Sequence, residues 1–137
     1  MNWIYQGREL TPEEITKCPA FVYLIVNLTN NKKYIGKKLT TKAGYKTVAG
    51  KRKRLRLQSD FMDYYGSNEE LQNDVKVLGS ENFRREILHF CRTKSEASYL
   101  ELREQIDNRV LESDDYYNSW IMCRVRKAHI GKINEII

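Results

Sequence analysis

The sequence has little cysteine and no long hydrophobic run, and each absence excludes a class of protein. The cysteines are far apart, odd in number and never spaced as a C-x-x-C pair: Cys18, Cys91 and Cys123. This spacing supports neither a disulfide framework nor a zinc knuckle, so we expect free, mostly buried thiols. The longest apolar run, Ala20 to Val26, is too short to cross a bilayer, and the N-terminus lacks a secretory signal. The sequence therefore predicts a soluble, cytoplasmic protein without a membrane partner.

Acidic residues are missing from one long stretch of the chain. Between Lys32 and Arg56 there are eleven lysines and arginines and no aspartate or glutamate. The rest has 13 basic against 18 acidic residues, a net charge of −5, although the whole chain has +6. A basic segment on an acidic body is typical of a polyanion-binding surface, whereas most charge runs are only solvated loops. The complete lack of acids favours binding, and the lack of an amphipathic stripe favours nucleic acid over a membrane.

Strand signals come early in the chain. A threonine cap followed by proline predicts a short helix after Thr11, and Pro19 ends it. β-Branched and aromatic residues then predict a hairpin of strands 21–27 and 33–38 around a polar turn at 29–31.

Helix signals dominate the second half. Capping residues and glycines predict a helix between Ser59 and Gly66. They predict a second helix that begins at Ser67 or Asn68, ends at Gly79 and buries Leu71, Val75 and Leu78. A strand follows at 82–90, and then a longer helix at 94–111 whose periodicity predicts one buried face: Tyr99, Leu102, Ile106 and Val110. This order predicts an α+β fold with a small antiparallel β-sheet flanked by helices.

The basic segment divides into two parts. Residues 42–50 contain two glycines and little periodicity, which predicts a loop. In "KRKRLRLQ", arginines alternate with lysine and leucine, so an extended conformation would place Arg52, Arg54 and Arg56 on one face. Such a row would direct three guanidinium groups at phosphates.

Side-chain parity relates the two tyrosines of the hairpin. If the turn is centred on Thr29 and Asn30, Tyr34 lies opposite Ile25 and shares a face with its diagonal neighbour Tyr23, about 7 Å away. Two phenols at that separation could converge on one ligand. Residue types alone favour a simpler role, a cross-strand aromatic pair that supports the sheet.

The tyrosines belong to two short blocks with a known counterpart. Tyr23 ends "FVY", and after ten residues Tyr34 begins "YIG". This arrangement resembles the GIY-YIG nuclease family, in particular its phage and bacterial homing-endonuclease-like members. Four downstream sequence segments also resemble segments of the family and occur in the same order: "YYGSNEEL", "LGSENFRREIL", "EASYLELREQI" and "YYNSW". The resemblance covers residues 20–121 and is far more specific than the hairpin alone.

The resemblance implies an endonuclease that hydrolyses DNA phosphodiester bonds with Mg²⁺ or Mn²⁺. In this family the two tyrosines border the attacking water, a basic side chain contacts the scissile phosphate, and a glutamate on a helix binds the metal. A metal ion activates water and neutralises charge in the transition state. A phenol acts as a base only when cationic neighbours lower its pKa from about 10, and Lys37 and Lys38 are such neighbours.

Two further residues match family positions. Glu101 matches the metal-ligand position, and Glu104, one helical turn later, is the alternate ligand. Asn118 in "YYNSW" matches an asparagine within or beside the active site. The simpler alternatives are a surface glutamate in a charged helix and an asparagine that satisfies loop backbone groups.

The family's catalytic arginine has no match at its usual place on a helix after the second tyrosine. The basic insertion occupies that interval, so the cation is Arg56, or next in preference Arg54, from the insertion; the alternative is Lys37 or Lys38 from the hairpin, without a preference between them. Tyr64 or Tyr65 replaces the family's next histidine or tyrosine, or packs in the core. His89 and His129 match no family position, and His89 is expected to be a satisfied strand histidine.

These inferences give a single domain, 1–137, in four parts. They are an extension at 1–19, a nuclease-like core at 20–121, the basic insertion at 37–58 within that core, and a basic tail at 122–137. The tail is too short for a recognition domain, so specificity comes from the insertion, from a homodimer, or is largely absent. The alternative function is a non-catalytic nucleic-acid-binding protein that retains the fold, and an acidic protein partner is a remote third. The predicted DNA-binding residues are Lys37, Lys38, Lys51, Arg52, Lys53, Arg54 and Arg56.

Overall fold

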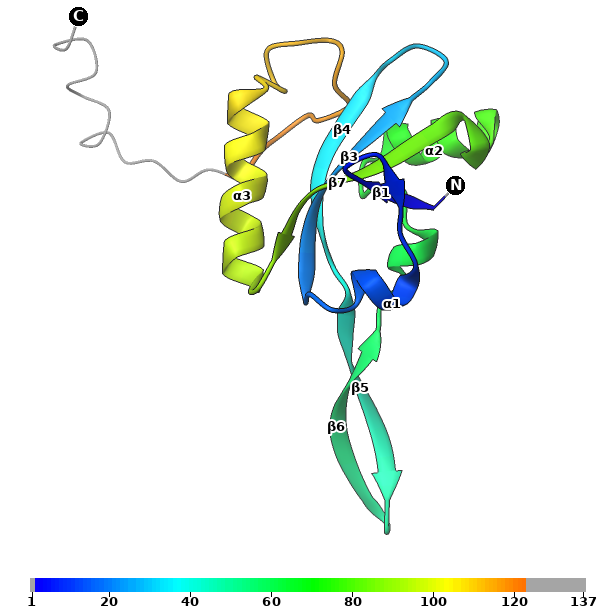
Figure 1. Ribbon diagram of the computed structural model, residues 1–137, viewed down its shortest axis with the longest axis vertical. Coiled ribbons are helices and arrows are strands. Elements are labelled where there is room, and N and C mark those ends of the chain that lie inside the picture. The colour runs from blue at the N-terminus through cyan, green and yellow to red at the C-terminus, as the bar shows by residue number, and fades with distance from the viewer. Residues whose placement is uncertain (1, 123–137) are drawn as a thin grey trace, which may run out of the picture.

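A five-stranded sheet forms the centre of the computed structural model, which describes residues 2–122 (Figure 1). Its strand order is β2-β1-β7-β3-β4, and every neighbouring pair is antiparallel except β1 with β7. The strands are β1 (Trp3–Tyr5), β2 (Arg8–Glu9), β3 (Ala20–Asn27), β4 (Lys33–Leu39) and β7 (Phe83–Cys91). The predicted α+β class with a mainly antiparallel sheet is confirmed, and β4 lies at one edge.

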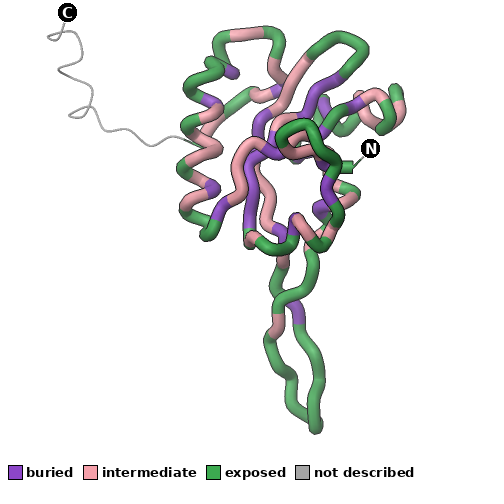
Figure 2. Tube along the Cα trace, in the orientation of Figure 1, coloured by how far each residue is buried: buried purple, intermediate pink, exposed green. Residues whose placement is uncertain are grey.

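Helices cover both faces of this sheet. On one side α3 (Lys94–Asp107) packs over a small cluster that includes Ala20 and Val22. On the other side, α1 (Pro12–Ile15), the 3-10 turn η1 (Phe61–Asp63) and α2 (Glu69–Leu78) enclose the larger core. Because side chains alternate, β3 is buried on both faces, as Figure 2 shows by its purple trace.

The register of the β3–β4 hairpin is the one predicted from parity. Tyr34 lies opposite Ile25, and the rings of Tyr23 and Tyr34 are 6.1 Å apart between centroids in an edge-to-face arrangement. Asn27 and Lys32 close a four-residue turn, in which Asn31 has a φ of 62°. An even loop length preserves the parity on which the prediction rested.

The predicted loop at 42–50 is wrong, because these residues form a strand. Strand β5 (Thr41–Val48) pairs with β6 (Lys51–Gln58) around a two-residue turn of Ala49 and Gly50, at φ 53° and 76°. We call residues 41–58 the arm; it is a separate two-stranded sheet that projects from the body (Figure 1). The glycine that hid the strand, Gly44, makes room for the side chain of Leu57, which lies across it.

The predicted helix between Ser59 and Gly66 is also wrong, since only η1 forms there. The Ser59 hydroxyl donates to the Leu39 carbonyl at 2.6 Å instead of capping a helix. The buried guanidinium of Arg85 donates to the carbonyls of Met62 and Tyr64 at 3.0 and 2.9 Å. These carbonyls would otherwise accept the hydrogen bonds that continue a helix. The next helix, α2, begins and ends as predicted, with Asn68 as its cap, but of its predicted buried residues only Leu71 is fully buried.

Helix α3 turns a different face to the sheet than its periodicity predicted. Tyr99 and Ile106 are exposed, at 64% and 49%, and the buried positions of the helix are instead Ala97 and Gln105. Val110 is buried as predicted, but it follows the helix, which ends at Asp107. The prediction failed because polar side chains of α3 hydrogen-bond to β4, so this helix contacts the sheet partly through polar groups.

The remaining sequence predictions divide between described and undescribed residues. His89 lies on β7 and contacts Glu104 with 2.7 Å between Nε2 and Oε1, as expected for a satisfied strand histidine. Cys18 and Cys91 are free thiols, as expected. No helix within residues 2–122 is long and apolar enough to cross a membrane. Cys123, His129 and the rest of the basic tail lie outside the described residues.

Candidate active site

A cleft of about 390 Å³ lies along the edge strand β4. Its walls come from β4, from α3, from the loop before α2 and from the segment after α3. That segment follows the outer side of β4, where the Tyr117 amide donates to the Lys33 carbonyl at 2.6 Å. The lining residues are Tyr34, Lys37, Ser67, Asn68, Ser98, Glu101, Gln105, Asn118, Ser119, Trp120, Ile121 and Met122.

Tyr34 presents its hydroxyl to this cleft. The hydroxyl lies 2.9 Å from the Ser67 Oγ, which holds the phenol in one orientation. Burial raises the pKa of Tyr34, and the hydrogen bond with Ser67 opposes that shift. The phenol is therefore protonated at neutral pH in the free protein.

Tyr23 lies behind Tyr34 and does not line the cleft. It is fully buried, and its hydroxyl oxygen is 3.5 Å from that of Tyr64. Its ring crosses Gly36, where an added Cβ would lie 2.5 Å from the Tyr23 hydroxyl oxygen. Gly66 adjoins the same hydroxyl and has a φ of +87°, a conformation that favours glycine. The glycine of "YIG" is thus required by the close approach of the first tyrosine.

The lysines next to the second tyrosine block do not lower the pKa of Tyr23 or Tyr34. Burial raises the pKa of Tyr23 well above its ordinary range, and negative charge on the neighbouring phenols would raise it further. Lys37 and Lys38 are adjacent in sequence but point to opposite faces of β4, because side chains alternate along a strand. Neither lysine contacts the Tyr23 or Tyr34 hydroxyl in the hydrogen bonds and ion pairs of the described residues.

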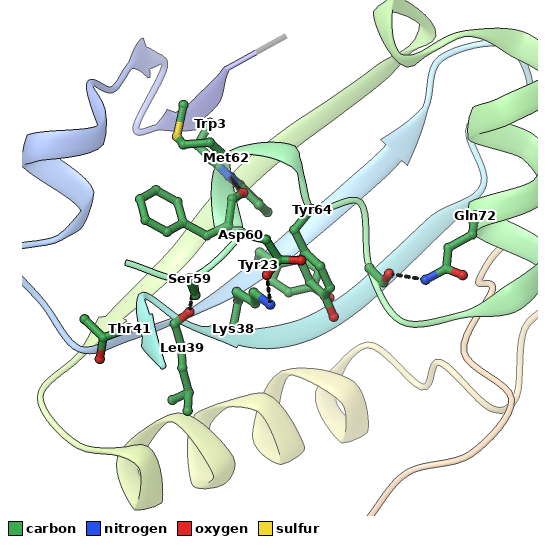
Figure 3. A network of polar contacts seen from close by, with 12 residues as sticks. Trp3, Tyr23, Lys38, Leu39, Thr41, Ser59, Asp60, Met62, Tyr64 and Gln72 are labelled. Carbon is green, nitrogen blue, oxygen red and sulfur yellow. Dashed lines mark hydrogen bonds and ion pairs between the residues drawn. The ribbon is translucent and has the colours of Figure 1, made fainter. Parts of the chain in front are cut away.

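The two lysines have different partners. Lys38 lies on the tyrosine face, 4.1 Å from the Tyr64 ring centroid, and forms an ion pair of 2.6 Å with Asp60 (Figure 3). Lys37 lies on the α3 face and donates to the Ser98 hydroxyl at 2.5 Å. Lys37 is the one basic residue among the described residues of the cleft, and no acidic ion-pair partner holds it.

Glu101 faces Lys37 from α3 and is the one acidic residue among those described in the cleft. Burial raises the pKa of its carboxyl group, while the ammonium and backbone amide of Lys37 oppose this shift. Glu104, the alternate ligand, is bound to His89 and does not line the cleft.

The single carboxylate of the described cleft, Glu101, suits a weakly ligated ion. No cluster of three His, Cys, Asp or Glu side chains exists within residues 2–122. Mg²⁺ commonly binds through one or two carboxylates and completes its shell with water and substrate phosphates. A partly buried carboxylate with a raised pKa is a site where a divalent cation would offset the cost of ionisation. The residues present therefore fit such an ion.

Asn118 lines the cleft and also bonds to backbone groups, so both features predicted for it are present. Its amide pairs with both backbone groups of Ile35, accepting from the N–H at 3.1 Å and donating to the carbonyl at 2.8 Å. Gln105 donates to the same carbonyl at 3.0 Å. These two side chains fasten the C-terminal segment and α3 to the edge strand, and so position the walls of the cleft.

The arginines preferred from sequence are not in the cleft. Arg54 and Arg56 both lie on the arm, and the Arg56 guanidinium donates to the Thr41 hydroxyl at 2.9 Å. The structure therefore places Lys37, and not Arg56, beside Glu101 and Tyr34. Tyr64 lies within the tyrosine cluster, whereas Tyr65 stacks on the buried Arg85 guanidinium at 4.3 Å.

Sequence reasoning missed several cleft residues. Ser67 lies inside the quoted word "YYGSNEEL", and Trp120, which is 68% exposed, ends "YYNSW". The quoted words thus contained a signal for both. Ser98 and Gln105 had no comparable signal, because their roles depend on which face α3 turns to β4.

Comparisons with known proteins agree on one family. The family model described as "Putative endonuclease segE, GIY-YIG domain" matches residues 3–121. A relative from Enterobacteria phage T4, named "Putative endonuclease segE", is 36% identical over 99 residues, which are 72% of this chain. The match spans only 39% of that relative's length. No solved structure matches this chain.

Proposed function

Because this chain belongs to the GIY-YIG nuclease family, we propose that it is an endonuclease that hydrolyses DNA phosphodiester bonds with Mg²⁺ or Mn²⁺. The observation that supports this most strongly is the meeting of Tyr34, Lys37 and Glu101 in one cleft. They come from two elements and both faces of β4, so core packing alone does not explain why a phenol, a cation and a carboxylate converge in one cleft.

Each of the three side chains has a role that follows from its environment. Lys37 binds a non-bridging oxygen of the scissile phosphate, because it is the one cation of the described cleft and its ammonium donates to a serine hydroxyl and not to a carboxylate. Tyr34 hydrogen-bonds the attacking water. Since burial raises the pKa of Tyr34, the phenol orients that water as a neutral group and not as a tyrosinate.

Glu101 would hold the divalent cation, together with water and phosphate oxygens. When bound, the cation supplies Lewis-acid stabilisation of the charge that develops on the phosphate. Tyr23 is a positioning residue, because it contacts Tyr34 and Tyr64 from within the core and cannot reach a substrate in the cleft.

Cleavage of supercoiled plasmid tests this function. The full chain is expected to nick or linearise the plasmid in Mg²⁺ and to be inactive in EDTA. Glu101→Gln should abolish cleavage while leaving DNA binding in place. The matched control is Glu104→Gln on the same helix, which keeps a hydrogen-bonding group toward His89 and should cut at about the wild-type rate.

Two results would contradict the proposal. Equal cleavage by wild type and Glu101→Gln would remove Glu101 from the site. Salt-sensitive binding without cleavage in any divalent ion would instead identify a non-catalytic nucleic-acid-binding protein with the family's fold.

A further inference from the structure

The arm has few interactions that would stabilise it by itself. Its strands pair only with each other, and an isolated two-stranded ribbon is marginally stable in water. Residues 41–58 include seven lysines and arginines and no acid, so like charges repel along its length. A polyanion would neutralise that charge, which makes the arm better suited to a bound state than to water alone.

The strand register gives the arm two chemically different faces. Residues directly opposite each other in an antiparallel pair share a face, so Arg54 lies beside Tyr45 and Arg52 beside Thr47. One face therefore presents the three arginines, and we call it the arginine face. The opposite face presents lysines and aliphatic residues: Lys46, Lys51, Lys53, Leu55 and Leu57.

Aromatic and hydroxyl groups of the arm hold two of the three arginines. The Arg52 guanidinium stacks 3.9 Å from the centroid of the Tyr45 ring, which is itself 58% exposed. The Arg56 guanidinium is fixed at the base by Thr41. A planar, pre-oriented guanidinium is suited to bidentate hydrogen bonds with the O6 and N7 atoms of guanine.

The dimensions of the arm fit the major groove of duplex DNA. That groove is about 12 Å wide and admits a two-stranded ribbon, whereas the minor groove of undistorted duplex DNA is only about 6 Å wide. Alternate residues of a strand are about 6.7 Å apart, which is close to two base-pair steps of about 3.4 Å. Arginines at every second position would thus meet every second base pair.

A basic hollow connects the arm to the cleft. Its lining includes Lys37, which it shares with the cleft, together with Lys42, Arg56 and Lys94. The two ends of the arm are joined at its base, where the Ser59 amide donates to the Thr40 carbonyl at 2.9 Å. The Thr40 hydroxyl in turn donates to the Cys18 carbonyl at 2.7 Å. The arm therefore leaves the body in a direction set by these bonds.

We infer that the arm enters the major groove beside the cut and reads base pairs with its arginine face, an inference that rests on DNA being the substrate. The opposite face adds phosphate contacts that give affinity without sequence information. Eight residues per strand reach about 26 Å, so the positions read lie within about eight base pairs of the cleaved bond.

Selection of bound sequences tests this inference separately from cleavage. The probe is a pool of short duplexes with a randomised stretch, incubated with the full chain in EDTA, so that binding is measured whether or not the protein cuts. The wild type should enrich guanines at alternating positions. The double variant Arg52→Lys with Arg54→Lys keeps the positive charge and loses the planar guanidinium group that donates two parallel hydrogen bonds. It should lose roughly 5- to 150-fold of discrimination at each position read, with an unchanged salt dependence.

The matched control is Lys51→Ala with Lys53→Ala on the opposite face. It should weaken binding of all sequences alike and reduce the salt slope by about one per lysine, with the enriched sequence unchanged. Thermal melts of every variant should match the wild type. No enrichment by the wild type, or the same enrichment after the arginine substitutions, would overturn the inference. Enrichment without cleavage in Mg²⁺ would instead refute the proposed nuclease activity and leave the role of the arm standing.

Discussion

At the scale of single residues, the site consists of groups whose ordinary titration is disturbed by burial. The phenols of Tyr23 and Tyr34 and the carboxyl group of Glu101 all have raised pKa values. The phenols are therefore neutral at physiological pH and serve as hydrogen-bonding groups. Glu101 must ionise to bind a cation, and in the free protein this ionisation costs free energy of folding.

The linkage between this pKa and stability gives a prediction for Glu101→Gln. Below the ordinary glutamate pKa of about 4.3, Glu101 is protonated in both the folded and the unfolded state. As the pH rises through and above that value, the unfolded state loses its proton more readily, so the wild type becomes less stable than at low pH. In EDTA, Glu101→Gln should therefore unfold at higher urea than the wild type at pH 7, and this advantage should vanish near pH 4.

Mg²⁺ should make the wild type more stable than Glu101→Gln at pH 7. Mg²⁺ that binds the folded and not the unfolded wild type stabilises the folded state. The melting temperature should then rise with the logarithm of the Mg²⁺ concentration once that concentration exceeds the dissociation constant. Glu101→Gln should show no such rise. A variant that is less stable than the wild type in EDTA at pH 7, or that gains as much stability from Mg²⁺, would contradict the role given to Glu101.

At the scale of elements, a buried arginine sets the position of the tyrosine cluster. Arg85 on β7 is 2% exposed and lies between the rings of Trp3 and Tyr65. Its donors meet the carbonyls of η1 and of Tyr64, and so fix the segment that places the Tyr64 hydroxyl beside Tyr23. This one side chain determines both the end of η1 and the packing behind the cleft.

Loss of that arginine should destabilise the whole fold. Arg85→Met removes the side-chain donor to the Met62 and Tyr64 carbonyls, and we expect a loss of about 2 to 4 kcal/mol in the free energy of unfolding, measured by urea denaturation. The matched control is Arg84→Met on the same strand, where an exposed pair with Glu86 at 3.8 Å is lost. The control should change stability by less than about 0.5 kcal/mol, and equal effects of the two substitutions would argue against this role of Arg85.

The β3–β4 register could be predicted from the sequence pattern, whereas the buried face of α3 could not. The β3–β4 register followed from parity because both faces of β3 are buried, and a slip by one residue would expose Tyr23. The face of α3 could not be predicted in the same way. Its apolar stripe, with Tyr99 and Ile106, points outward, since Gln105 meets β4 through a hydrogen bond. Periodicity reports where apolar residues lie and not which polar groups find partners across the chain.

The site was predictable to a similar degree. Tyr34 and Glu101 were found through the motif words, and the structure brings both to the cleft. Which basic residue lines the cleft was not predictable, because the positions of Lys37 and Arg56 relative to the cleft depend on the path of the chain between them. That path is a strand pair that carries Arg56 away from the cleft. The strand pair was not predicted, because Gly44 within it is not a typical strand residue and Ala49–Gly50 is not a typical hairpin turn.

At the scale of the whole molecule, the protein divides its positive charge between two tasks. The body has a net negative charge apart from the basic segment, and its described cleft contains a single lysine. The arm and the hollow at its base hold most of the remaining basic residues of that segment. In this account the body performs the chemistry at the edge of the sheet, and the arm holds the duplex against it.

The most direct test of this division is the single-turnover rate of plasmid cleavage, with protein in excess, for Lys37→Ala and Arg56→Ala. At saturating protein the rate reports the chemical step and is insensitive to weaker binding. Lys37→Ala should lower this rate by about 100- to 1,000-fold, the range expected for losing a donor that stabilises transition-state charge. Arg56→Ala should require more protein to saturate and then cut near the wild-type rate. A wild-type rate for Lys37→Ala together with a lost rate for Arg56→Ala would place the catalytic cation on the arm and contradict the account.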